Sequence, residues 1–212
     1  MIEKFRHIIW DWNGTLLNDV DLSLSIINKI LTNRGIKELS LEGYRNIFTF
    51  PVRNYYEFAG INLKKYSFEE VGKEWIEEYE KRRLECRLFN GAEQVLNSTL
   101  EKTGGQSILS AYSQSSLEEI ILHFELNMYF TYLTGLDHIY ATGKKDLAKS
   151  LLKRLKIDRE KILLVGDTIH DYEVASETGI KCVLISNGHQ SRERLLECKV
   201  PVLNNLTELL DY

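Results

Sequence analysis

Short apolar runs alternate with helical patterns over much of the chain, and their order predicts the fold. The first run spans residues 5–11; it is β-prone and ends at Asp11, before a turn sequence, which indicates a buried strand. Further strands are expected at residues 106–109, 136–141, 161–165 and 181–185. Helices are expected at residues 91–102, 116–125, 146–156, 171–178 and 206–210. This alternation predicts an α/β fold with a Rossmann-like, three-layer core built on a parallel sheet.

The stretch from residue 18 to residue 90 has a different pattern. Apolar residues recur at helical spacing over residues 19–34, and an aromatic stripe marks a second long helix at residues 67–85. No segment of this stretch has the pattern of a buried parallel strand. We therefore interpret residues 18–90 as a helical insertion, and residues 1–17 together with 91–212 as the core.

Composition and charge narrow the classes of partner. The chain has 212 residues and a formal net charge of -4, so it lacks a basic surplus that would neutralise nucleic-acid phosphates. No apolar run approaches the ~20 residues that span a bilayer. Three cysteines without metal-ligand spacing indicate free thiols in a reducing compartment. The sequence therefore predicts a cytoplasmic protein, monomeric or homodimeric, that binds neither nucleic acid nor membrane.

Polar side chains follow several of the expected strands at their carboxyl ends. These side chains are Asp11, Ser110, the pair Lys144 and Lys145, and Asp167 with Asp171. The carboxyl edge of an open α/β sheet is where ligands bind, so these groups are expected to meet there. Together they provide a carboxylate nucleophile, a hydroxyl donor, a cation, and carboxylates suited to Mg²⁺. Phosphoryl transfer needs this set, because a lysine neutralises charge on the transferring group.

Four motifs, in order, resemble those of the haloacid dehalogenase-like hydrolase superfamily, on its phosphatase side. Residues 11–15 read Asp-Trp-Asn-Gly-Thr, similar to the family's Asp-x-Asp-Gly-Thr, and residues 166–171 fit its Gly-Asp-x-x-x-Asp. Ser110 and the Gly-Lys at residues 143–144 match its second and third motifs. The resemblance covers nearly the whole chain. It implies that residues 18–90 form a helical cap, as in phosphoglycolate-phosphatase-like members.

The resemblance also implies residue roles. Asp11 is expected to attack phosphorus and form an aspartyl-phosphate, which water then hydrolyses. The expected ligands of Mg²⁺ are Asp11, the backbone carbonyl of Asn13, and Asp167. Asp171 is expected either to bind the ion through water or to position the lysine. The substrate is expected to be a small phosphorylated metabolite, whose phosphoryl group contacts Ser110, Ala111 and Lys144. Lys144 is preferred to Lys145 because Gly-Lys followed by a helix start matches the family better.

One expected contact lies outside the motifs. Arg53, in the predicted cap, is expected to meet a second anion of the substrate, with a solvated arginine as the alternative. His189 follows the last strand, so it belongs either at the rim of the site or on the surface.

Asn13 departs from the family pattern, which has at this position an Asp that protonates the leaving oxygen. An amide donates a hydrogen bond but cannot exchange a proton in this way. Acid–base catalysis contributes ~10²–10⁴-fold, or about 3–5 kcal/mol of barrier. Three explanations stay open: a leaving group that needs no acid, such as an acyl phosphate; a substitute such as His170; or a catalytically weak, phospholigand-binding or regulatory relative.

Overall fold

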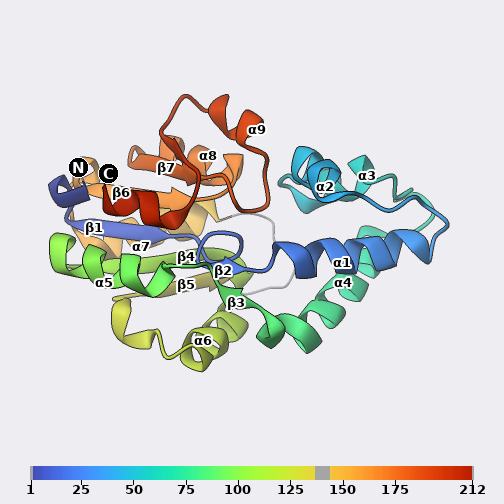
Figure 1. The fold of residues 1–212 in the computed structure, drawn as a ribbon, viewed down its shortest axis with the longest axis horizontal. Helices are drawn as coiled ribbons and strands as arrows, with labels where there is room; N and C mark the ends of the chain where they lie inside the picture. The colour runs from blue at the N-terminus through green and yellow to red at the C-terminus, as the bar shows by residue number, and fades with distance from the viewer. Residues whose placement is uncertain (1, 137–143, 212) are drawn as a thin grey trace.

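A parallel sheet forms the centre of the protein. The computed structural model describes residues 2–136 and 144–211. Six strands lie in the order β5-β4-β1-β6-β7-β8, and every neighbouring pair is parallel (Figure 1). The strands are β1 (His7–Trp10), β4 (Gln106–Ser113), β5 (Leu133–Leu136), β6 (Ile162–Gly166), β7 (Lys181–Ile185) and β8 (Val202–Leu203). The predicted α/β, Rossmann-like core is confirmed.

Each face of the sheet is covered by helices. Successive residues of a strand point to opposite faces, so Ile8 joins one hydrophobic cluster and Ile9 the other. The first cluster includes α5 (Ala92–Thr103), α6 (Gln114–His123) and η5 (Leu206–Leu210). The second includes α7 (Lys145–Leu155), α8 (Ile169–Thr178) and α9 (Arg192–Leu196). The short 3-10 helices η1 (Ile2–Lys4), η3 (Asn127–Tyr129) and η4 (Arg159–Lys161) complete the connections.

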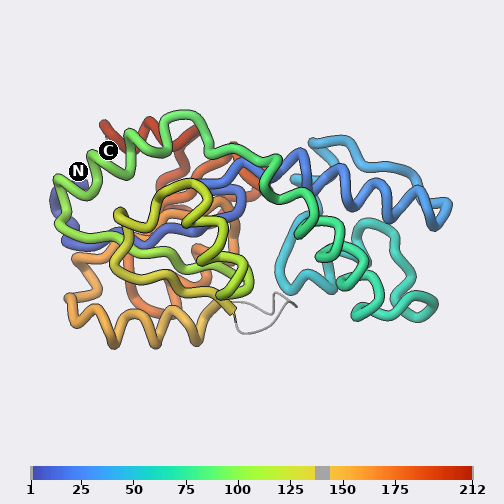
Figure 2. Tube along the Cα trace, turned by 90° about the horizontal axis from the view of Figure 1, so that it is seen from below, coloured from blue at the N-terminus to red at the C-terminus, as the bar shows by residue number. Residues whose placement is uncertain are grey.

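Four helices form a group beyond one end of the sheet, which we call the helical unit (Figures 1 and 2). They are α1 (Val20–Thr32), α2 (Leu41–Ile47), α3 (Val52–Phe58) and α4 (Phe68–Arg82). The 3-10 turn η2 (Arg83–Glu85) and an antiparallel ribbon, β2 (Leu17–Asn18) with β3 (Arg87–Leu88), connect it to the rest of the chain. Buried apolar residues such as Ile26 in α1 and Val71 in α4 belong to the first cluster, which therefore continues into this unit. Among the described residues, no helix is both long and apolar enough to cross a membrane.

Several elements differ from their sequence-based prediction. The strand expected at residues 106–109 continues to Ser113, because an irregularity after Leu109 shifts its register with β5 without ending it. Ser110 therefore lies within β4, and the N-cap of α6 is Ser113. The final segment, residues 206–210, is a 3-10 helix. Of the strand expected at residues 136–141, only Leu136 is among the described residues, as the end of β5.

Candidate active site

One pocket of about 390 Å³ lies at the carboxyl edge of the sheet. Its lining comes from the ends of β1, β4, β6 and β7, from the start of α7, and from the helical unit. Its lining includes six of the residues singled out from the sequence: Asp11, Asn13, Ser110, Ala111, Lys144 and His189. Asp11 follows β1, and its N–H still donates to the Val165 carbonyl of β6 at 2.9 Å. The register shift in β4 lets the Ser110 hydroxyl accept the Tyr112 N–H at 3.1 Å, which leaves the hydroxyl proton available to a ligand.

Three buried carboxylates surround one buried ammonium beside this pocket. Oxygens of Asp11, Asp167 and Asp171 lie within 4.8 Å of one another. The Lys144 Nζ lies 2.7 Å from Asp11 Oδ1 and 2.5 Å from Asp171 Oδ1. It also donates to the Leu109 carbonyl at 3.2 Å. Because three carboxylates share one lysine, ionising all three gives the cluster an excess of negative charge, which suits a hard divalent cation.

Burial and mutual repulsion shift the pKa values of this cluster. Burial raises the pKa of Asp11 well above its usual range, although Lys144 opposes the shift. Burial also raises the pKa of Asp167 to about 6; repulsion by Asp171 adds to this rise, whereas attraction by His189 opposes it. For Asp171, burial is outweighed by Lys144 and Thr168, which lower its pKa. Asp171 is therefore the group most firmly held as an anion in the cluster.

The loops after β1 and β6 fix these carboxylates through close backbone contacts. Gly14 has a φ of +74°, and a Cβ there would collide with the Asp167 carboxylate, so the position requires glycine. The Thr15 hydroxyl donates to Asp167 Oδ1 at 3.2 Å, and the His189 N–H donates to Asp167 Oδ2 at 2.6 Å. Asp171 Oδ2 accepts the N–H and hydroxyl of Thr168, at 3.0 and 2.7 Å, at the start of α8. Helix capping thus leaves Asp171 Oδ1 facing Lys144.

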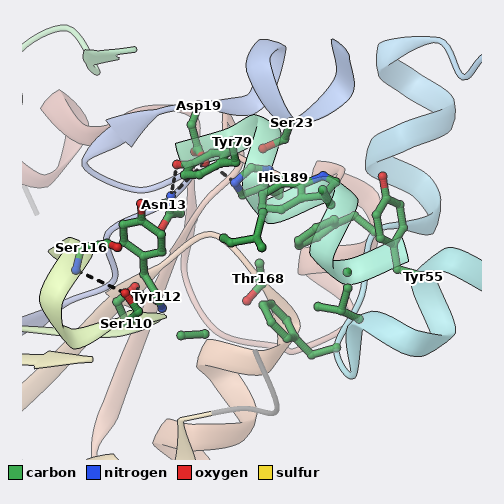
Figure 3. Close-up of a pocket in the computed structure, with 18 of the residues that line it drawn as sticks. Asn13, Asp19, Ser23, Tyr55, Tyr79, Ser110, Tyr112, Ser116, Thr168 and His189 are labelled. Carbon is green, nitrogen blue, oxygen red and sulfur yellow. Dashed lines mark hydrogen bonds and ion pairs between the residues drawn. The ribbon is translucent and has the colours of Figure 1, made fainter. Parts of the chain in front are cut away.

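A second buried network holds the side chain of Asn13 (Figure 3). Its Nδ2 donates to Asp19 Oδ2 at 2.9 Å and to the Tyr79 hydroxyl at 2.6 Å. Asp19 also accepts the Gly14 N–H and the Tyr79 hydroxyl, each at 2.9 Å. His189 Nε2 lies 3.2 Å from Asp19 Oδ1. Because a carboxylate only accepts hydrogen bonds, Asp19 fixes which end of the Asn13 amide faces it.

Asp19 and His189 form a charged pair within this network. Burial alone would raise the pKa of Asp19, but His189 and the hydrogen-bond donors around it lower that pKa. Burial alone would lower the pKa of His189, but Asp19 raises it to about 9. His189 is therefore protonated near neutral pH and Asp19 is ionised. Sequence reasoning gave no role to Asp19; its one signal was a carboxylate placed shortly after the Asp11 motif.

Three other candidates lie away from the pocket lining. Arg53 is exposed, and its guanidinium lies over the Phe68 ring at 4.8 Å. Lys145 faces Glu177 at 3.2 Å on the surface, whereas Lys144 is buried. His170 is buried behind the site, where its Nε2 accepts the Lys144 N–H at 3.3 Å. The structure thus separates Arg53 and Lys145 from the residues that it brings together.

Comparison with known proteins identifies the family. The sequence profile of the haloacid dehalogenase-like hydrolases matches residues 8–185, so the chain belongs to this family. A 5'-nucleotidase from Pseudomonas aeruginosa is 25% identical over 203 residues, which cover 91% of this chain and 87% of the relative. A phosphoglycolate phosphatase from Aquifex aeolicus is 29% identical over 195 residues, covering 87% and 86%. A haloacid dehalogenase-like family hydrolase from Streptococcus pneumoniae shares the fold, with a TM-score of 0.75 at 19% identity over 99% of this chain and 98% of its own.

Proposed function

We propose that the protein is a Mg²⁺-dependent phosphatase of a small phosphorylated metabolite and that Asp11 is its nucleophile. The observation that carries this proposal is the position of Lys144, which contacts both Asp11 and Asp171 within a pocket. A carboxylate beside a buried ammonium can attack phosphorus while the ammonium holds the phosphoryl oxygens. The names of the curated relatives support the same reaction class.

The donor set at the site fits Mg²⁺. We assign the ion to Asp11, Asp167 and the backbone carbonyl of Asn13, where it would neutralise the excess carboxylate charge and polarise the phosphoryl group. Both oxygens of Asp171 already face donors, Thr168 and Lys144. We therefore assign Asp171 to positioning Lys144. Ser110 and the N–H of Ala111 complete the phosphate contacts.

In the first step, an Asp11 oxygen bonds to phosphorus and the leaving oxygen departs with its electron pair. In the second step, water attacks phosphorus and releases Asp11 and inorganic phosphate. Lys144 holds the phosphoryl oxygens during both steps.

We assign the helical unit, within residues 18–90, to the role of a cap over the pocket. Residues from this unit, such as Tyr44 and Tyr79, line the pocket together with Asp11 and Ser110. A cap in this position excludes bulk water and selects the leaving group. The predictions of a cytoplasmic location and of a monomer or homodimer stay predictions.

A second candidate function follows from Asn13. Both of its amide N–H groups face acceptors, so the side chain supplies neither a proton nor a free donor to a leaving oxygen. A chain with this site is also suited to bind a phosphorylated ligand with little turnover.

Hydrolysis of acetyl phosphate and p-nitrophenyl phosphate with Mg²⁺ distinguishes the two candidates. An enzyme hydrolyses at least one of them, and Asp11→Asn abolishes the turnover. Asp146→Asn makes the same chemical change at a side chain that is 99% exposed, so it should have no effect. Phosphate binding without Asp11-dependent turnover would favour the binding protein.

A further inference from the structure

The pocket continues from Asp11 into a space lined mainly by aromatic rings of the helical unit. This lining includes the rings of Phe48, Phe50, Tyr55, Phe68 and Trp75. A cavity of ~150 Å³ is enough for one benzene ring, and ligand pockets usually measure ~300–1,000 Å³. The pocket of about 390 Å³ therefore has room for a phosphate group and an attached ring.

Two of these rings stack on side chains of the Asn13–Asp19 network. Trp75 stacks on Tyr79, with ring centroids 4.9 Å apart and an interplanar angle of 14°. Phe48 stacks on His189 at 4.9 Å and 28°. Tyr79 and His189 both contact the Asn13–Asp19 network. A ring attached directly to the phosphoryl oxygen would meet these aromatic surfaces.

The charges of the lining disfavour an anionic leaving group. Among the described residues that line the pocket, Lys144 and His189 are the cationic side chains. Lys144 already pairs with Asp11 and Asp171, and His189 pairs with Asp19. Glu80 also lines the pocket and pairs with Arg83 at 2.9 Å. Among the described lining residues, a carboxylate on the substrate would therefore meet aromatic rings and cations that are already paired, which is unfavourable.

The amide of Asn13 disfavours a leaving group that needs protonation. Its two N–H groups are occupied by Asp19 and Tyr79, and an amide cannot deliver a proton. A phenol has a pKa of about 10, whereas the pKa of an aliphatic alcohol is much higher and close to that of water. A phenolate therefore leaves without a proton donor far more readily than an alkoxide.

From these two independent features we propose that the substrate is a phosphate monoester of an uncharged phenol-class hydroxyl group, that is, an aryl phosphate. The inference rests on the proposed phosphatase function and specifies its leaving group. The bond from Asp11 to phosphorus forms as the bond from phosphorus to the aryl oxygen breaks. The phenolate takes the electron pair and then a proton from solvent. Water next attacks phosphorus as the bond from phosphorus to the Asp11 oxygen breaks, which releases the Asp11 carboxylate, hydrogen phosphate and a proton that passes to solvent.

Four phosphate compounds separate the ring requirement from the leaving-group requirement. Phenyl phosphate has both a ring and a good leaving group, whereas benzyl phosphate has a ring and a poor one. Acetyl phosphate has only the good leaving group, and phosphoglycolate has neither. We expect KM for phenyl phosphate to be at least ~10-fold below that for acetyl phosphate, and its kcat to exceed that for benzyl phosphate by ~10²-fold or more.

Matched variants test whether the aromatic lining recognises the ring. Trp75→Leu should raise KM for phenyl phosphate about 10-fold and leave KM for acetyl phosphate unchanged. Phe58→Leu, a change of an exposed aromatic outside the lining, should affect neither compound. Phe50→Leu leaves the Trp75–Tyr79 stack intact, so it repeats the measurement should Trp75→Leu fail to fold.

The outcomes distinguish failure of this inference from failure of the proposed function. Equal turnover of phenyl phosphate and either phosphoglycolate or benzyl phosphate would overturn the aryl phosphate proposal and leave the phosphatase proposal standing. The same conclusion would follow if Trp75→Leu and Phe50→Leu changed KM equally for phenyl phosphate and acetyl phosphate. Absence of any Asp11-dependent turnover across the four compounds would overturn both.

Discussion

Replacing Asn13 by Asp tests the proposal that the site has no acid for the leaving group. The substitution restores the family's usual residue, but it places a carboxyl group where the amide nitrogen now lies 2.9 Å from Asp19 Oδ2. Asp19 is buried and is held as an anion by His189. The new side chain must therefore either repel Asp19 or carry a proton.

The two costs can be compared. Two unit charges at this separation repel by about 6 kcal/mol at an effective dielectric constant of about 20. Protonating an aspartate at pH 7 costs about 4 kcal/mol, because its ordinary pKa is about 3.9 and one unit is ~1.4 kcal/mol. Proton uptake is the cheaper response, so the pair in Asn13→Asp should hold one proton near neutral pH. We expect that proton to serve as the acid that the amide of Asn13 cannot supply.

The assay compares two esters that differ in their need for a proton. We expect Asn13→Asp to raise kcat for benzyl phosphate at least ~10-fold, because an alkoxide leaves poorly without protonation. For phenyl phosphate we expect less than about a threefold change, because a phenolate needs little help. The extra proton of the folded state should also make the variant lose stability as pH rises through the raised pKa, more steeply than the unmodified protein.

Asn13→Ala is the control, since it removes the amide without adding an acid, and it should improve neither ester. Equal gains for both esters in Asn13→Asp, or the same gain in Asn13→Ala, would refute the reasoning. So would an Asn13→Asp protein whose thermal stability has the same pH dependence as that of the original chain.

Three further predictions concern the neighbouring charges. Burial disfavours the protonated form of His189, but Asp19 raises the pKa of His189 from 6.5 to about 9. This shift contributes about 3 kcal/mol to the free energy of unfolding below pH 6.5, and the contribution should be lost as pH rises through 9. Thermal unfolding from pH 6 to pH 10 should show this loss, and His189→Gln should not. In steady-state assays, Lys144→Met should lower kcat ~10²–10³-fold, whereas Lys145→Met should change kcat less than about twofold. Similar losses of kcat in the two variants would mean that the site uses both lysines. EDTA should abolish turnover, and added Mg²⁺ should restore it. The Asp167→Asn variant should need at least ~10-fold more Mg²⁺ for half-maximal activity. Full activity in EDTA would exclude the assigned cation.

The sequence was sufficient to predict the main strands of the core and the carboxylates that follow two of them. A buried parallel strand is a local apolar run, so β1 and the carboxylate of Asp11 at its end are visible without a structure. The same is true of β6 and Asp167, because a parallel sheet brings such ends to one edge. The register shift in β4 was not visible, because it depends on pairing with β5 and not on the composition of either strand.

The network around Asn13 could not be predicted from local patterns. Asp19 and His189 are separated by 170 residues, yet their side chains lie 3.2 Å apart. Asp19 has the sequence context of a helix start, which explains its presence adequately without a partner. The substrate contact expected of Arg53 stays a prediction; its guanidinium lies over the Phe68 ring at 4.8 Å. Long-range pairs of this kind depend on how the helical unit meets the core.

The most direct measurement is the covalent state of Asp11 during turnover. The protein is mixed with excess phenyl phosphate and Mg²⁺, quenched in acid within the first turnover, and digested for mass spectrometry. A phosphoryl group on the peptide that contains Asp11, absent in Asp11→Asn, is the expected result. Turnover that proceeds without this modification, or with the phosphoryl group on another residue, would contradict the proposed role of Asp11.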